Sequence, residues 1–92
     1  MPLRVYLTQM LVRHLGLKAE FTAEARTVEE LLDTIDAEHH GFRDSVCDES
    51  GHIRVYVNVF VNGRMLGREP DALSRRLSDG DEVHILASVA GG

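Results

Sequence analysis

The stretch from Ile53 to Gly67, "IRVYVNVFVNGRMLG", constrains the fold more than any other part of the chain. Its β-branched residues, Ile53 and the valines at 55, 57, 59 and 61, alternate with other types up to Asn62-Gly63. Such alternation is typical of strands, and both central residues of a type I′ turn need positive φ, which Asn-Gly tolerates at the lowest cost. The stretch therefore predicts a β-hairpin that turns at Asn62-Gly63.

Apolar residues also alternate at both ends of the chain. The N-terminal pattern predicts a strand over 3–7, and "LKAEFTAEA" (17–25) predicts a second strand that forms a hairpin with the first. We expect 9–16 to form a turn or half-turn of helix that ends at Gly16. The last strand, "EVHILASVA", places four apolar side chains on one face: Val83, Ile85, Ala87 and Val89.

The main helix is predicted between these hairpins, in "RTVEELLDTIDAEHHG". Thr27 and Glu30 have the spacing of a capping box, and Gly41 is the expected end. The helix stripe that faces the core is formed by Val28, Leu31, Leu32 and Ile35.

Shorter helical pieces are predicted elsewhere. Phe42 and Val46 have the spacing of a short helical turn that fills the core, and Pro70 opens another piece anchored by Leu73 and Leu77. Asp79-Gly80-Asp81 predicts a tight turn before the last strand.

The resulting order is β-β-α-β-β-short helix-β, which predicts an α+β fold of the β-grasp (ubiquitin-like) roll type. We expect a mixed sheet of about four or five strands packed on one main helix, with short helical turns. Because the inward face of the last strand is wholly apolar, that strand is expected to be central and parallel to the first. The expected organisation is one domain, 1–89, followed by a flexible diglycine tail, 90–92.

Composition narrows the class of partner. The 92 residues are 43% apolar, and the net charge of −5 argues against binding to a nucleic-acid backbone. Lys18 is the only lysine, so isopeptide-linked chains built on this protein are not expected. The single cysteine excludes an intramolecular disulfide and fits a reducing compartment. With neither a signal peptide nor a long apolar run, we expect a cytoplasmic protein with no membrane partner.

The chain offers no catalytic constellation of residues. It has no Gly-rich phosphate loop, no CxxC pair and no supported Ser-His-Asp set. His39 and His40 would point about 100° apart on a helix, so they make a poor metal site. Cys47 has no evident base beside it and is expected to be a packing thiol, and Arg75-Arg76 a solvated pair. We therefore expect no catalytic residue, no metal and no bound cofactor.

The stretch "SVAGG", Ser88–Gly92, raises a different possibility. Terminal glycines can simply fray. Alternatively, Ala90, Gly91 and Gly92 carry no side chain larger than a methyl group, so the segment can thread a narrow channel and deliver the α-carboxylate of Gly92 into a partner's active site. That carboxylate needs activation, for example as an acyl-adenylate; a sulfur nucleophile then gives a thiocarboxylate and an amine gives an isopeptide. The chain would be a co-substrate and not a catalyst.

With this order of elements, the "VNG" hairpin, the "LSDGDEVHIL" run and the "VAGG" end, the sequence resembles the ubiquitin-like sulfur-carrier family. That family includes the small subunit of molybdopterin synthase and the carriers of the thiamine and cysteine pathways. The resemblance spans essentially the whole chain. The turn of Asp79–Val83 together with Gly91-Gly92 is a fairly specific combination.

The resemblance implies that Gly92 is adenylated by an activating enzyme related to those of ubiquitin, which uses ATP and a sulfur donor. Gly92 then becomes a thiocarboxylate, Gly91 is its companion in the channel, and a sulfur-accepting enzyme is the second partner. Ser88-Val89 stand where many molybdopterin synthase subunits have proline, and "CDESGHIRVYVNVFVNG" is longer than in the thiamine carriers. The chain is more similar to the cysteine-pathway carriers and the molybdopterin-like proteins grouped with them.

A partner-binding surface is expected on the sheet face opposite the helix. If the valines at 57, 59 and 61 face the helix, then Tyr56 and Phe60 face away, as do His84 and Leu86 on the last strand. Apolar groups on an open face near the tail suit docking to an activating enzyme. The alternative is that sheet curvature or the loop 41–53 covers them.

Other functions remain open at this point. The protein could be a modifier that forms isopeptides with target lysines, the small subunit of molybdopterin synthase, or a pure interaction module. Deleting Gly91-Gly92 separates the last of these from the others, because a binding module keeps its function without the diglycine.

Overall fold

The computed structural model describes residues 1–88, and Val89–Gly92 lie outside the described residues. Within these residues, three α-helices and one 3₁₀ helix accompany five strands. In chain order the elements are β1 (Leu3–Leu7), α1 (Gln9–Leu15), β2 (Glu20–Ala23), α2 (Val28–Glu38), α3 (Phe42–Val46), β3 (Val57–Val61), β4 (Arg64–Met65), η1 (Pro70–Ser74) and β5 (Glu82–Ala87).

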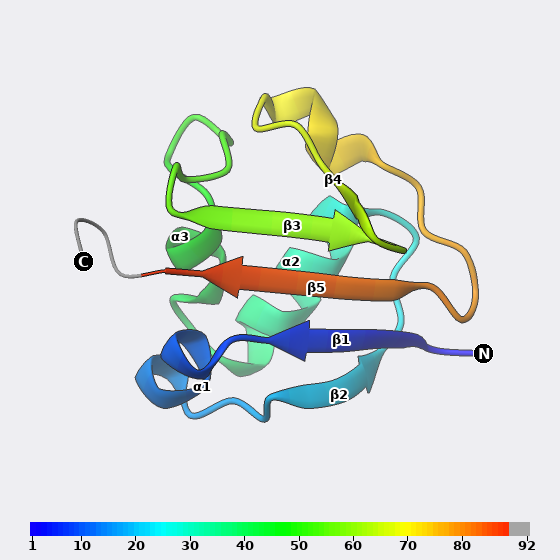
Figure 1. Cartoon of the computed structure of the whole chain (residues 1–92), viewed down its shortest axis with the longest axis horizontal. Helices are drawn as coiled ribbons and strands as arrows, with labels where there is room; N and C mark the ends of the chain where they lie inside the picture. Colours follow the sequence, from blue (N-terminus) through cyan, green and yellow to red (C-terminus); the bar gives the residue numbers. More distant parts are fainter. Residues whose placement is uncertain (89–92) are drawn as a thin grey trace.

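The strands form one five-stranded mixed sheet in the order β2-β1-β5-β3-β4. β5 is central and runs parallel to β1, while β2, β3 and β4 pair antiparallel with their neighbours. Figure 1 shows α2 behind the sheet, and within residues 1–88 no helix covers the front face. The predicted β-grasp fold and the central position of the last strand are confirmed.

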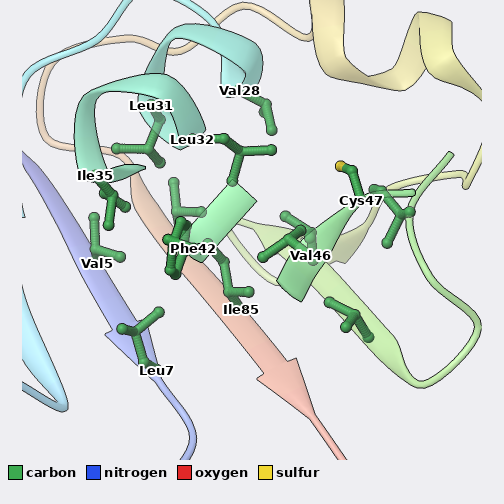
Figure 2. Close-up of a cluster of buried hydrophobic side chains, with 14 of the residues drawn as sticks. Val5, Leu7, Val28, Leu31, Leu32, Ile35, Phe42, Val46, Cys47 and Ile85 are labelled. Carbon is green, nitrogen blue, oxygen red and sulfur yellow. The ribbon is translucent and has the colours of Figure 1, made fainter. Parts of the chain in front are cut away.

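The core lies between the sheet and α2. Phe42 is completely buried and lies between the side chains of α2 and Ile85 of β5 (Figure 2). Val46 enters the same cluster, as the spacing from Phe42 predicted. Every second residue of each central strand contributes to this core; in β3 the buried residues are Val57, Val59 and Val61. The hydrophobic periodicity of the sequence therefore identifies the core correctly.

Helix α2 begins as predicted and ends earlier than predicted. The Thr27 hydroxyl oxygen accepts a hydrogen bond from the N–H of Glu30 at 3.1 Å. The helix ends at Glu38, however, and not at Gly41. The carboxylate of Asp36 accepts from the N–H groups of Gly41 and Arg43, which turns the chain, and Gly41 with φ 97° begins α3.

Helix α1 is longer than the expected turn or half-turn. It spans seven residues and buries Leu11, while Val12 and Leu15 pack against the core. Packing of this apolar side stabilises a helix that its short sequence would not predict. Gly16 ends it in the left-handed conformation, with φ 69°, as expected.

Strand β3 begins at Val57, four residues later than the alternating pattern. Ile53 instead forms an isolated bridge with Cys47, and the chain turns at Val55-Tyr56. The guanidinium of Arg68 donates hydrogen bonds to the carbonyls of Arg54 and Val57 on either side of this turn. A polar contact with a distant arginine thus decides where the strand starts.

The predicted Asn-Gly turn is confirmed, with φ 51° at Asn62 and 83° at Gly63. The Asn62 side chain also links the hairpin to β5. Its Nδ2 donates to Asp81 Oδ1 at 3.0 Å, and its Oδ1 accepts from the N–H of Glu82 at 2.9 Å. Hydrogen bonds from the Asn62 amide and from the N–H of Ser78 lower the pKa of the Asp81 carboxyl. The first residues of β5 are therefore fixed by a side chain of the neighbouring turn.

Within residues 1–88, no helix combines the length and hydrophobicity that crossing a bilayer requires.

Two glycines allow a matched test of the hairpin turn. Gly63 has positive φ and Gly67 does not, and an added Cβ meets nothing within 4 Å at either position. We expect Gly63→Ala to lower the free energy of unfolding by about 1–2 kcal/mol, because an L-residue is strained in the left-handed region. Gly67→Ala should be neutral or slightly stabilising. Urea denaturation measures both, and equal stability of the two variants would contradict the backbone-strain explanation.

Candidate functional site at the end of the last strand

The end of β5 is held on its β1 side by Thr8. The Thr8 hydroxyl accepts a hydrogen bond from the N–H of Ala87 at 3.2 Å and donates one to the carbonyl of Ala87 at 3.3 Å. Thr8 is also the N-cap residue of α1, but its side chain makes no capping bond there. The hydroxyl that would ordinarily cap a helix is used to fix the last residue of the sheet.

The same segment is held on its β3 side by the turn that precedes β3. Ala87 is opposite Val57 in the register, and the N–H of Ser88 donates to the carbonyl of Tyr56 at 3.0 Å. In Figure 1 the end of β5 lies between β1 and β3, at the edge of the sheet where α1 and α3 also lie. The backbone is therefore fixed on both sides as far as Ser88, and the residues that follow start from a defined point.

A small hollow of about 190 Å³ lies beside this point. Its lining comes from α1, α3, the turn before β3 and the end of β5: Met10, Leu11, His14, Ser45, Tyr56 and Ala87. Tyr56 is half-buried and packs against the core cluster. Tyr56 precedes Val57, the first residue of β3, and lines this hollow together with Ala87, whereas the sequence pattern grouped it with Phe60 on the opposite face of the sheet.

The front face of the sheet carries a row of side chains across four strands. The register places Tyr6 beside His84, His84 beside Phe60, and Phe60 beside Met65. The rings of Tyr6 and His84 stack with centroids 4.4 Å apart. Leu86 lies two residues farther along β5 on the same face and is 36% exposed. Phe60 and Leu86 therefore share a face, as expected, and Tyr56 lies apart from them.

The loop 41–53 does not cover this face. Its apolar residues belong to the core, on the α2 side of the sheet: Phe42, Val46, Cys47 and Ile53. The front face is flanked by charge, since Arg4 pairs with Glu82 at 3.1 Å and His84 Nε2 lies 3.6 Å from the same carboxylate. A mainly apolar row that contains one imidazole and is bordered by an ion pair is the composition expected of a transient protein–protein contact.

Several residues of the front face and of the end of β5 were not singled out from the sequence. Tyr6 and Met65 occupy outward positions of β1 and β4, so alternation alone would have found them. Val55, 84% exposed in the turn beside Tyr56, would have needed the position of that turn. Nothing in the sequence pattern identifies Thr8, whose role depends on a contact 79 residues away.

The remaining candidates stay apart from this site. Burial raises the pKa of the Cys47 thiol, which is 2% exposed, in agreement with a packing role. Arg75 and Arg76 are exposed, as expected. Across residues 1–88, no three His, Cys, Asp or Glu side chains lie close enough together to hold a metal ion. The expected reacting residue, Gly92, and its neighbours Gly91 and Ala90 lie outside the described residues.

The five-stranded sheet with one long helix across its back defines the chain as a ubiquitin-like protein of the β-grasp class. The ThiS family matches residues 8–92, and the chain belongs to this family as a sulfur carrier protein. Such carriers are generally not catalysts themselves.

The chain is similar to several known members. It is 30% identical over 94 residues to sulfur carrier protein CysO of Mycobacterium tuberculosis, with all of both chains covered. It is 36% identical over 66 residues to small archaeal modifier protein 3 of Haloferax volcanii, which covers 72% of this chain and 70% of that one. A chain of the crystal structure of the Amycolatopsis orientalis BexX/CysO complex superposes with a TM-score of 0.80 at 29% identity, covering 98% of this chain and 99% of that chain.

The Thr8 contact can be tested by hydrogen exchange. We expect Thr8→Val, which keeps the shape but loses the hydroxyl, to speed exchange of the Ala87 amide about fivefold, since one hydrogen bond contributes about 1 kcal/mol. Thr8→Ser, which keeps the hydroxyl, should leave exchange of the Ala87 amide as slow as in the unchanged protein. The Val83 amide, earlier in the same strand, serves as the internal control. An Ala87 rate unchanged in Thr8→Val would show that the hydroxyl does not hold the end of β5.

Proposed function

We propose that the protein carries sulfur as a thiocarboxylate on Gly92. Residues 1–89 are the domain and 90–92 the tail. A partner enzyme uses ATP to adenylate the Gly92 carboxylate: a carboxylate oxygen bonds to the α-phosphorus and pyrophosphate leaves. Sulfide (HS⁻) supplied by a donor then adds to the acyl carbon, and AMP leaves with the electron pair of the broken C–O bond. The thiocarboxylate sulfur attacks an acceptor bound to a second partner and displaces its leaving group. Water then cleaves the C–S bond of the resulting thioester, so the sulfur stays on the acceptor and the carboxylate is regenerated for another cycle.

The observation that carries the proposal is the anchoring of β5 on both sides as far as Ser88. The four residues that follow can reach at most about 13–14 Å when fully extended. Because Ala90, Gly91 and Gly92 add nothing larger than a methyl group, a partner's channel can close around them. A fixed origin with a slender extension keeps the carboxylate within a defined radius of the docked domain, which reduces the entropy lost in the encounter.

The front face of the sheet is the proposed docking surface for the adenylating enzyme. Phe60 and Leu86 are the expected anchors, and Tyr6, His84 and Met65 extend the same apolar row. Tyr56 contributes from the hollow beside the tail and not from this face. Binding on the front face leaves the end of β5 pointing along the partner's surface, where an active-site channel can receive the tail.

The likeness to CysO supports a sulfur-donating role, with biosynthesis of cysteine, a cofactor or a related compound as the destination. The solved BexX/CysO complex supports the idea that such a carrier forms a complex with a partner protein. Use as the small subunit of molybdopterin synthase is an alternative destination for the same thiocarboxylate.

A second function, protein modification, is favoured by the likeness to small archaeal modifier protein 3. It requires the same adenylate, followed by attack of a target lysine amine in place of sulfur. Immunoblots of cell extract against the protein distinguish the two: a ladder of larger conjugates that disappears without Gly92 indicates modification.

Intact-mass analysis tests the carrier proposal directly. After incubation with ATP, sulfide and a candidate activating enzyme, we expect a mass gain equal to replacement of one oxygen by sulfur. Removal of Gly91-Gly92 should abolish it, because no carboxylate then reaches the active site. If the truncated chain still gains this mass, the sulfur is carried at another position. If the truncated chain still supports its cellular function, the protein is a pure interaction module.

Phe60→Asp tests the docking surface. We expect the variant to fold but to be adenylated at least tenfold less efficiently, since a carboxylate on the apolar row must be desolvated on binding. Ala37→Asp, on the exposed side of α2, is the matched control and should be adenylated normally. Pyrophosphate release measures the rates. Normal kinetics for Phe60→Asp would remove the front face as the docking site.

A further inference from the structure

A larger hollow, of about 400 Å³, lies on the other side of the sheet between β2 and the C-terminal half of α2. Its apolar wall is formed by Leu17, Phe21, Ala23 and Ile35. Thr34 and Glu38 of α2, the C-cap residue His39 and Lys18 also line it. The volume falls in the range of ligand-binding pockets, and neither the tail proposal nor the front face uses it.

One wall of this hollow is the free edge of the sheet. β2 is the outermost strand of the described sheet and pairs only with β1. The N–H of Leu7 donates to the carbonyl of Ala19, so Ala19, Phe21 and Ala23 turn their backbone groups toward β1. Since alternate residues of an antiparallel ladder face opposite edges, the N–H and C=O groups of Glu20 and Thr22 point outward. The hollow therefore lies beside unsatisfied strand-pairing groups.

The charges around this edge select the partner. Glu20 on the strand, Glu24 just after it and Glu38 on the helix border are exposed, and the nearby cations are Lys18 and, beyond Glu24, Arg26. A second copy of the chain would bring the same acidic groups together, which disfavours pairing of β2 with itself. A basic segment gains from these carboxylates instead.

We propose that the β2 edge binds an extended basic segment of a partner protein as an added strand. The partner's backbone pairs with Glu20 and Thr22, its alternate apolar side chains fill the hollow against Phe21 and Ile35, and its Lys or Arg residues lie near the three glutamates. Addition of a strand to a sheet edge gives affinity through the backbone and specificity through alternate side chains. This binding site goes beyond the sulfur-carrier function and is independent of Gly92.

The experiment titrates the full ¹⁵N-labelled chain with the peptide Arg-Val-Thr-Val-Thr-Val-Arg. We expect the amide signals of Glu20 and Thr22 to shift and their hydrogen exchange to slow. The same peptide with Glu at both ends should bind about tenfold more weakly, because it meets three like charges. Shifts confined to Tyr6, Phe60 and His84, or no binding at millimolar peptide, would overturn the proposal.

Thr22→Pro removes the outward N–H without a bond to β1 being lost, and proline is accepted on edge strands. We expect peptide binding to fall at least tenfold, whereas Thr22→Val, which keeps the N–H, should bind normally. Adenylation of Thr22→Pro should be unchanged, which separates this proposal from the carrier function.

A second pair of variants leaves the strand intact in case Thr22→Pro does not fold. Thr34→Arg places a long cation in the hollow and should weaken binding of the basic peptide at least tenfold, and Ala37→Arg on the exposed side of α2 should not. Normal binding by Thr34→Arg would overturn the proposed groove. Self-association of the chain by sedimentation, abolished in Thr22→Pro, would identify a second copy as the occupant and overturn the choice of a basic partner.

Discussion

The parallel pairing of β5 with β1 is the constraint on which the rest of the structure depends. A parallel neighbour places the C-terminal end of β5 at the same edge as the β1–α1 corner, where Thr8 can reach Ala87. Antiparallel β3 closes the other side, where the carbonyl of Tyr56 receives the N–H of Ser88. Because both edges of β5 are paired, fraying of its end must break hydrogen bonds to β1–α1 and to the turn before β3 together, and the backbone as far as Ser88 is held at a defined position.

The same strand serves the core, the front face and the exit of the chain through its period-two alternation. Val83 and Ile85 are buried under α2, while His84 and Leu86 stand on the front face. A shift of the register by one residue would exchange these two sets. The Asn62 side chain at the beginning of β5 and Thr8 at its end oppose such a shift. Burial of the apolar residues determines which side chains of β5 face the core, and the polar contacts at its two ends stabilise that register.

Most of the fold could be predicted from the sequence because the signals are local. The Thr27 cap, the apolar stripe of α2 and the Asn62-Gly63 turn depend on residues within a few positions of each other. What could not be predicted depends on distant polar groups. The Asp36 carboxylate accepts hydrogen bonds from amides that follow α2, so the helix ends before Gly41. The Arg68 guanidinium binds the turn that precedes β3, so the strand begins after Tyr56 and not at Ile53. The site divides in the same way: Phe60 and Leu86 follow from alternation, and Thr8 does not.

The position of β2 has a consequence for how partners could share the molecule. β1 separates β2 from β5, and the proposed groove lies on the α2 side, whereas Phe60 and Leu86 lie on the front. A carrier that meets an activating enzyme and then an accepting enzyme must offer one tail to both in turn. A segment bound at the β2 edge would leave the tail free, so a partner tethered there would hold the carboxylate at high effective concentration near its own active site. Binding of a partner's strand at the β2 edge would then increase the rate at which the Gly92 carboxylate reacts in that partner's active site, although the tail itself is unchanged.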